Sequence, residues 1–186
     1  TLFPYTTLFR SKRDVVRLVT AGTLTEDSLL DARHHNFLAA YAQVRDTGAL
    51  AWVDVSTGDF HISECSQVML PPLLARLSPR ELLVAASTEE AMTPLAAEAN
   101  AVLTPLSAAS FDSTNAEARL KELFGVSSLD AFGQFGRAEL AAMGGLVAYL
   151  DLTQRGKLPL LRPPLRESMG KAMQIDAATR RNLELT

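Results

Sequence analysis

The stretch DVSTGDF, residues 54–60, holds the side chains whose types and spacing are best suited to chemistry. Asp54 ends a run of apolar residues and is followed by a Ser/Thr/Gly turn that closes on Asp59. A carboxylate at the end of a buried strand is a ligand for a hydrolytic metal ion, and the amides of such a turn bind phosphate groups. The stretch therefore indicates two activities, metal-dependent hydrolysis and phosphate binding.

Both activities need partners that the sequence does not supply. The first arrangement is that of ribonuclease H-like nucleases, and the second is that of actin-like and sugar-kinase ATPases. Two-metal hydrolysis requires three or four carboxylates around ions about 4 Å apart, whereas the apolar stretches ELLVAA and AVLTPL have no acid in their interiors. The sequence favours a structural role, in which Asp54 and Asp59 accept backbone amides at the turn. A ribonuclease H-like nuclease using Asp54 stays open as the alternative.

The histidines and the cysteine do not form a recognisable metal site. His34 and His35 are adjacent on an expected helix, so their side chains point in different directions. His61 and Cys65 lie four residues apart near the end of a strand, with no further ligand close in sequence. The chain also lacks the Gly-x-x-x-x-Gly-Lys-Ser/Thr loop and the Gly-x-Ser-x-Gly elbow. We therefore expect no catalytic, cofactor-binding or metal-ligating residue.

Charge and cysteine content exclude several classes of protein. The 186 residues include 18 Lys and Arg against 21 Asp and Glu, a net charge of −3, so no whole-chain field attracts nucleic acid. A single cysteine, Cys65, excludes a disulfide within the chain and a cysteine-rich zinc site, and it indicates a reducing, cytoplasmic compartment. No apolar run approaches the roughly 20 residues that cross a bilayer, and we expect no membrane contact.

The element that carries Asp54 is predicted to be a β-hairpin over 49–64, with its turn at 56–59. Its first strand is apolar on both faces, with Leu50 and Trp52 on one and Ala51 and Val53 on the other. A strand of this kind is central in its sheet and is covered on both sides.

Upstream of the hairpin, the pattern predicts a strand over 14–19 and a turn in which Gly22 supplies a permissive backbone. A helix is predicted to begin at Thr23, which stands at capping-box spacing before an acidic residue. Apolar residues recur at spacings of three, four and seven between 30 and 44, so this helix is predicted to end near Asp46.

Downstream of the hairpin, short apolar strands alternate with capped helices, which is the pattern of an α/β domain with a central mixed sheet flanked by helices. The expected strands cover 81–86 and 101–106, and the expected helices lie within 67–79, 87–100, 112–125 and 136–156. The last helix contains Gly144 and Gly145, which permit close packing against a neighbour.

Three blocks of the sequence, in this order, resemble the MutS family of DNA mismatch recognition proteins. VVRLVTAGTLTEDSLLDARHHNFLAA (15–40) is similar to the segment that leads into the connector domain of the family, and VDVSTGDFHISE (53–64) is similar to its connector hairpin. MQIDAATRRNLEL (173–185) resembles the signature that opens the core, or lever, domain. Ala21 departs from the family pattern, which usually has Pro there and a tighter turn.

The resemblance implies a ribonuclease H-like connector domain over 12–160 that lacks nuclease activity. A linker over 161–172 and the start of the helical core domain over 173–186 are expected to follow. Residues 1–11 do not resemble the family, and we expect them to be a foreign or artefactual leader.

The resemblance also implies a function for the longer protein of which this chain is a fragment. That protein is expected to be a homodimer that binds mismatched DNA, uses ATP with magnesium and signals to MutL. In the family, mismatch reading depends on a Phe-x-Glu motif and ATP hydrolysis on a P-loop domain, and this chain contains neither. The fragment is therefore expected to be no enzyme, to hold no cofactor and to contact MutL and other MutS domains. A structural interaction module from an unrelated repair or scaffold protein stays open as a further alternative.

Overall fold

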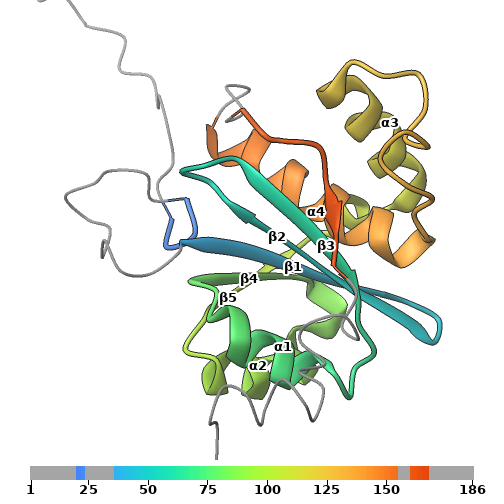
Figure 1. Cartoon of the computed structure of the whole chain (residues 1–186). Coiled ribbons are helices and arrows are strands. Elements are labelled where there is room, and N and C mark those ends of the chain that lie inside the picture. Colours follow the sequence, from blue (N-terminus) through green and yellow to red (C-terminus); the bar gives the residue numbers. More distant parts are fainter. Residues whose placement is uncertain (1–19, 24–35, 155–159, 168–186) are drawn as a thin grey trace, which may run out of the picture.

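A six-stranded mixed sheet forms the centre of the protein, as a computed structural model shows for residues 20–23, 36–154 and 160–167 (Figure 1). The strand order is β5-β4-β1-β2-β3-β6. The first three strands form an antiparallel meander, and the other three join it by parallel pairing. The strands are β1 (Phe37–Val44), β2 (Thr47–Asp54), β3 (Asp59–Glu64), β4 (Glu81–Ala85), β5 (Val102–Leu106) and β6 (Leu165–Arg166).

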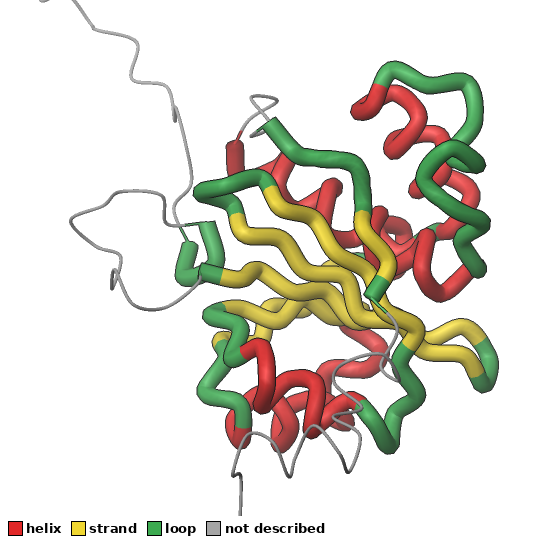
Figure 2. Tube along the Cα trace, viewed as in Figure 1, coloured by secondary structure: helices red, strands yellow, loops and turns green. Residues whose placement is uncertain are grey.

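Helices cover both faces of this sheet (Figure 2), so the predicted α/β fold with a central mixed sheet is confirmed. One face carries α1 (Leu70–Leu77) and α2 (Glu89–Glu98), and the other carries α3 (Ser113–Phe124) and α4 (Arg137–Gln154). Two 3-10 helices, η1 (Ala86–Thr88) and η2 (Ala108–Phe111), follow strands β4 and β5. Within the described ranges, no helix is both long enough and apolar enough to cross a membrane.

Strand β2 lies between β1 and β3 and separates two apolar cores. Ala51 and Val53 pack in the core beneath α3 and α4, whereas Leu50 and Trp52 pack in the core beneath α1 and α2. The predicted hairpin and the predicted coverage of its first strand on both sides are therefore confirmed.

The helix predicted to reach Asp46 is wrong over residues 37–44, which form β1. Leu38, Ala39, Ala40 and Tyr41 are consecutive and all buried, the burial pattern of a central strand. A continuous apolar run contains spacings of three, four and seven by default, so helical periodicity was a false signal here. The part of this prediction over 24–35 lies outside the described residues, as does the predicted strand over 14–19.

The downstream elements match the sequence prediction closely. Helix α3 begins after Asp112, whose carboxylate accepts the Asn115 N–H at 2.8 Å, and it ends at Gly125 with a φ of 63°. The two glycines of α4 permit close contact, because a Cβ on Gly144 would lie 2.3 Å from the Cβ of Ala116 on α3. A Cβ on Gly145 would meet the Phe111 ring at 2.4 Å. The predicted close packing at these glycines is confirmed.

Residues 160–167 return along the sheet after α4 and end in β6, beside β3 (Figure 1). The segment predicted to be a linker, 161–172, thus contains a short strand of the same sheet. Its remainder, the predicted start of a core domain over 173–186 and the predicted leader over 1–11 lie outside the described residues. The domain bounds stay predictions.

Candidate functional site

Asp54 and Asp59 face each other across the hairpin turn, as paired residues of β2 and β3. Asp54 is buried, and its Oδ1 accepts the Ser56 N–H at 2.9 Å and the Ser56 hydroxyl at 2.5 Å. Asp59 accepts the Thr57 hydroxyl at 2.9 Å and pairs with Arg162 at 2.6 Å. Asp54 therefore has the predicted role in the turn, whereas Asp59 accepts side-chain donors in place of a backbone amide.

The turn itself is covered by another part of the chain. Gly58 has a φ of 77°, and its Cα faces the carbonyl oxygen of Leu160, which would lie 2.1 Å from a Cβ at this position. The Arg162 N–H donates to the Gly58 carbonyl at 2.8 Å. Because residues 160–162 lie on the turn, its backbone does not fit the phosphate-binding hairpin that the sequence suggested.

His61 and Cys65 do not share a ligand site. A strand rises about 3.3 Å per residue, so positions four apart lie roughly 13 Å apart. Burial raises the pKa of the Cys65 thiol to about 11, which keeps it protonated at neutral pH. Among residues 20–23, 36–154 and 160–167, no three His, Cys, Asp or Glu side chains are grouped so as to hold a metal ion. His34 and His35 lie outside these ranges.

A buried carboxylate that sequence reasoning missed, Glu81, lies at the start of β4 and is 1% exposed. Its Oε2 accepts the Gly22 N–H at 2.8 Å, and its Oε1 accepts the hydroxyls of Thr104 at 2.7 Å and Tyr149 at 2.6 Å. Glu81 thus ties the incoming turn, residues 20–23, to β5 and α4. We call residues 20–23 the incoming turn below.

Close approach, not backbone freedom, explains the glycine of the incoming turn. A Cβ on Gly22 would lie 2.8 Å from Cδ1 of Leu38 and 2.9 Å from Cβ of Glu81. Gly22 does not adopt the permissive backbone conformation predicted from the sequence, because its φ is not in the left-handed region. The turn is also closed internally, since the Thr20 N–H donates to the Thr23 hydroxyl at 2.9 Å.

Asp54 and Glu81 do not converge, although both are buried carboxylates at one end of the sheet. Glu81 points toward α4, where it contacts Tyr149. Asp54 alternates with Leu50 and Trp52 along β2 and so belongs to the face covered by α1 and α2. The sheet therefore separates the two carboxylates, an arrangement opposite to the one that two-metal hydrolysis requires.

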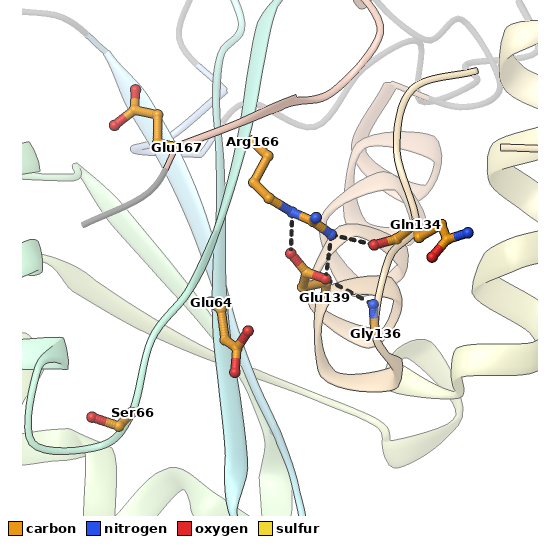
Figure 3. A pocket seen from close by; sticks show the side chains of 7 residues that line it. All are labelled: Glu64, Ser66, Gln134, Gly136, Glu139, Arg166 and Glu167. Atoms are coloured by element: carbon orange, nitrogen blue, oxygen red, sulfur yellow. Dashed lines mark hydrogen bonds and ion pairs between the residues drawn. The ribbon is translucent and has the colours of Figure 1, made fainter. Parts of the chain in front are cut away.

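A second polar cluster holds the outgoing strap, the name used below for residues 160–167. Arg166 of the strap forms a two-pronged ion pair with Glu139 of α4, with N–O distances of 2.9 Å at Nε and 2.8 Å at Nη2 (Figure 3). The Glu139 side chain is only 6% exposed, and its Oε2 also accepts the Gly136 N–H at 2.7 Å. Arg166 also donates to the Gln134 carbonyl and lies over the Phe135 ring, 5.1 Å from its centre.

The last residue of the strap contacts the opposite helical layer. Glu167 pairs with Arg76 of α1 at 2.9 Å. Its Oε1 lies 3.2 Å from Nδ1 of His61, and no hydrogen bond joins the two atoms. The His61 ring stacks on Trp52 with centroids 5.4 Å apart, and the Arg76 guanidinium lies 6.0 Å from the Trp52 ring centre.

An open hollow of about 590 Å³ lies where the strap crosses α4 (Figure 3). Its lining is polar, and its carboxylates at Glu139 and Glu167 are already paired with Arg166 and Arg76. The lining residues are Glu64, Ser66, Gln134, Gly136, Glu139, Arg166 and Glu167. The ion pairs at this hollow join the strap to α4 and to α1 of the same chain, so the arrangement connects segments.

Comparison with known proteins identifies the family to which this domain belongs. The family profile described as "MutS domain II" matches residues 36–162, which is more than half of the chain. The chain belongs to the MutS domain II family. The resemblance read from the three sequence blocks is thereby confirmed. The match ends at residue 162, so most of the strap lies beyond it.

Curated members of the MutS family are similar over nearly the whole chain. A protein of a Ruegeria species named "DNA mismatch repair protein MutS" is 64% identical over 176 residues. Proteins of the same name from Cereibacter sphaeroides and Paracoccus denitrificans are 64% and 63% identical. In each case the alignment covers 94% of this chain and 20% of the relative, so the chain spans about a fifth of the length of these relatives.

Two signals in the sequence would have pointed to the attachment residues. Glu81 opens a continuously apolar strand, where a charged residue needs buried partners. Glu139 stands three residues after Gly136 at the start of a helix, the spacing at which a carboxylate reaches back to the backbone.

Proposed function

We propose that this chain is the connector domain of a DNA mismatch repair protein, which fixes the directions in which neighbouring segments join it, offers a surface to MutL and carries out no reaction itself. The observation that carries the proposal is that buried carboxylates of the sheet and of α4 hold both ends of the described fold. Glu81 holds Gly22 of the incoming turn, and Glu139 holds Arg166 of the outgoing strap. Membership in the MutS domain II family supports it.

For the longer protein, we propose the properties expected of the family. It is a cytoplasmic homodimer that binds mismatched DNA, contacts MutL and uses ATP with magnesium. Other domains would supply the ATP site, because this chain has no phosphate-binding loop and its hairpin turn at Gly58 is covered by residues 160–162. No step of ATP hydrolysis is assigned to residues of this chain.

The alternative, a ribonuclease H-like nuclease using Asp54, is not favoured by the geometry. Asp54 accepts two donors from Ser56, and Glu81 faces the other side of the sheet. The direct test is incubation of the chain with labelled DNA and Mg²⁺ or Mn²⁺, beside the variant Asp54→Asn. We expect no cleavage by either protein, and cleavage that is lost in Asp54→Asn would establish the nuclease.

Binding to MutL tests the connector proposal. The purified 186-residue chain is immobilised, and MutL from the Ruegeria species serves as the soluble partner in an interferometry titration. We expect saturable binding, and we expect the free chain to compete for MutL. The complete MutS relative from the same organism is the positive control. If that relative binds and this chain does not, the chain lacks the MutL surface, and the alternative of an unrelated interaction module gains support.

A further inference from the structure

The outgoing strap is attached to the sheet by few backbone hydrogen bonds. Strand β6 pairs only with His61 and Ile62 of β3. The Arg162 N–H donates to the Gly58 carbonyl and the Glu167 N–H donates to the Ile62 carbonyl, each at 2.8 Å. By comparison, all eight residues of β2 pair with β1 on one side, and most pair with β3 on the other. Apart from the side-chain contacts of Arg162, Arg166 and Glu167, the strap therefore breaks few backbone hydrogen bonds when it leaves.

Little apolar surface holds the strap in place. Leu161 and Pro164 are buried, but Leu160 is 93% exposed and Leu165 is 61% exposed. Because burial of apolar side chains is the largest favourable contribution to folding, a segment with two buried residues opens at a free energy below that of the whole domain.

Glu139 has hydrogen-bond partners both when the strap is docked and when it is released. With the strap docked, the guanidinium group of Arg166 donates two hydrogen bonds to Glu139, at 2.8 and 2.9 Å. With the strap gone, Glu139 keeps the Gly136 N–H, and it lies in the first turn of α4, where the helix dipole stabilises a negative charge. The open state therefore does not leave a buried carboxylate without a partner, the situation that makes most buried ion pairs hard to break.

We propose that residues 160–167 form a releasable latch that docks on β3 and detaches from it as one unit while the rest of the sheet stays folded, with Arg166–Glu139 as its lock. When docked, the strap fixes the direction in which the chain continues beyond residue 167. When released, eight extended residues give the following segment a reach of roughly 25 Å from the sheet. The use of this motion to reorient a neighbouring domain rests on the proposed function, but the opening itself does not.

Native-state hydrogen exchange measured by NMR on the full chain tests the latch. The informative strap amides are those of Arg162 and Glu167, and the reference amides are those paired between β1 and β2, such as Ala51. We expect the strap amides to exchange at least about tenfold faster than the reference amides, because they open locally. Equal protection of the two groups would overturn the proposal, since the strap would then open only with the whole domain.

The variant Arg166→Gln tests the lock. We expect the strap amides to exchange about tenfold faster than in the unmodified chain, while the β2 amides keep their rates. The matched control is Lys121→Gln, which removes an exposed pair with Glu117 on α3 and is expected to change neither group. A uniform acceleration of all amides, or no change in the strap, would overturn the role of Arg166. The exchange test involves no MutL, so its outcome is separate from that of the binding experiment.

Discussion

The incoming turn and the outgoing strap are both held by a carboxylate of the core, but the surroundings of the two carboxylates differ. Glu81 is 1% exposed and accepts three uncharged donors from the turn, from β5 and from α4. Glu139 accepts a charged donor, Arg166, whose side chain is 41% exposed. One attachment lies inside the packed layer between the sheet and α4, and the other lies at its edge.

This difference determines whether each segment detaches alone or only when much of the domain unfolds. Solvent cannot replace the hydrogen bonds of Glu81 without opening the layer that contains Leu38 and Tyr149, so the incoming turn is lost together with much of the fold. Water reaches Arg166 directly and competes for its hydrogen bonds, so the outgoing strap can open alone. If the strap is released as proposed, the described fold has one rigid attachment and one adjustable attachment.

The largest effect is expected from Glu81→Leu, which breaks the buried attachment. The Gly22 N–H and the Tyr149 hydroxyl lose their acceptor inside the core, and we expect the free energy of unfolding to fall by about 3–5 kcal/mol. Urea denaturation followed by the fluorescence of Trp52, the single tryptophan, measures this change.

The control for this prediction is Glu81→Gln, which keeps one acceptor oxygen and is expected to lower stability by only about 1–2 kcal/mol. The comparison between the two junctions is wrong if Glu81→Leu destabilises the chain no more than Arg166→Gln does. In that case, the burial of an attachment would not determine how much it contributes to the free energy of unfolding.

The elements that could be predicted from the sequence are those defined by residues close to one another in the chain. The hairpin was predicted because Leu50 to Val53 alternate between two faces and a Ser/Thr/Gly turn follows. Helix α3 was predicted from a Ser or Thr cap and a stop at Gly125; the stop is confirmed, whereas the residue that caps the helix is the neighbouring Asp112. Each signal lies within a few residues of the element that it defines.

Long-range pairing explains what was missed. The partners of Glu81 are 23, 59 and 68 residues away in the chain, so no local pattern announces that this carboxylate is satisfied. Strand β1 is apolar from Phe37 to Ala42, and its conformation is decided by pairing with β2 and with β4, more than 40 residues downstream. The attachment residues were missed for the same reason: Asp54 lies in a local motif, whereas Glu81 and Glu139 contact residues far away in the chain.

A smaller effect is expected from Tyr149→Phe, which removes one of the three donors to Glu81. We expect a loss of about 1.5–3 kcal/mol at neutral pH, because the lost hydrogen bond has a charged acceptor. Burial, followed by the hydrogen bond to Glu81, raises the pKa of Tyr149 from 10.0 to about 12. Between pH 10 and 12, the unfolded chain therefore loses this proton while the folded chain keeps it, and the free energy of unfolding falls as the pH rises.

The pH dependence of the free energy of unfolding provides the control for this prediction. Tyr149→Phe is expected to show a shallower decline of stability between pH 10 and 12 than the unmodified chain. Cys65, whose pKa burial raises to about 11, contributes equally to both proteins and cancels from the difference. Parallel curves for the two proteins over this interval would show that Tyr149 is not shielded from solvent in the folded state, which contradicts a buried junction.

The smallest effect is expected at the start of the strap, where Arg162 pairs with Asp59 in an arrangement that leaves the two side chains 68% and 39% exposed. We expect Arg162→Gln to change stability by less than about 1 kcal/mol, because exposed ion pairs are screened and the Arg162 N–H still donates to Gly58. A double-mutant cycle with Asp59→Asn, measured at low salt and again at about 1 M salt, isolates the pair. A coupling energy well above 1 kcal/mol that persists in salt would show that side chains fix this end of the strap firmly. The outgoing strap would then be held as rigidly as the incoming turn, and the contrast between the two ends of the described fold would disappear.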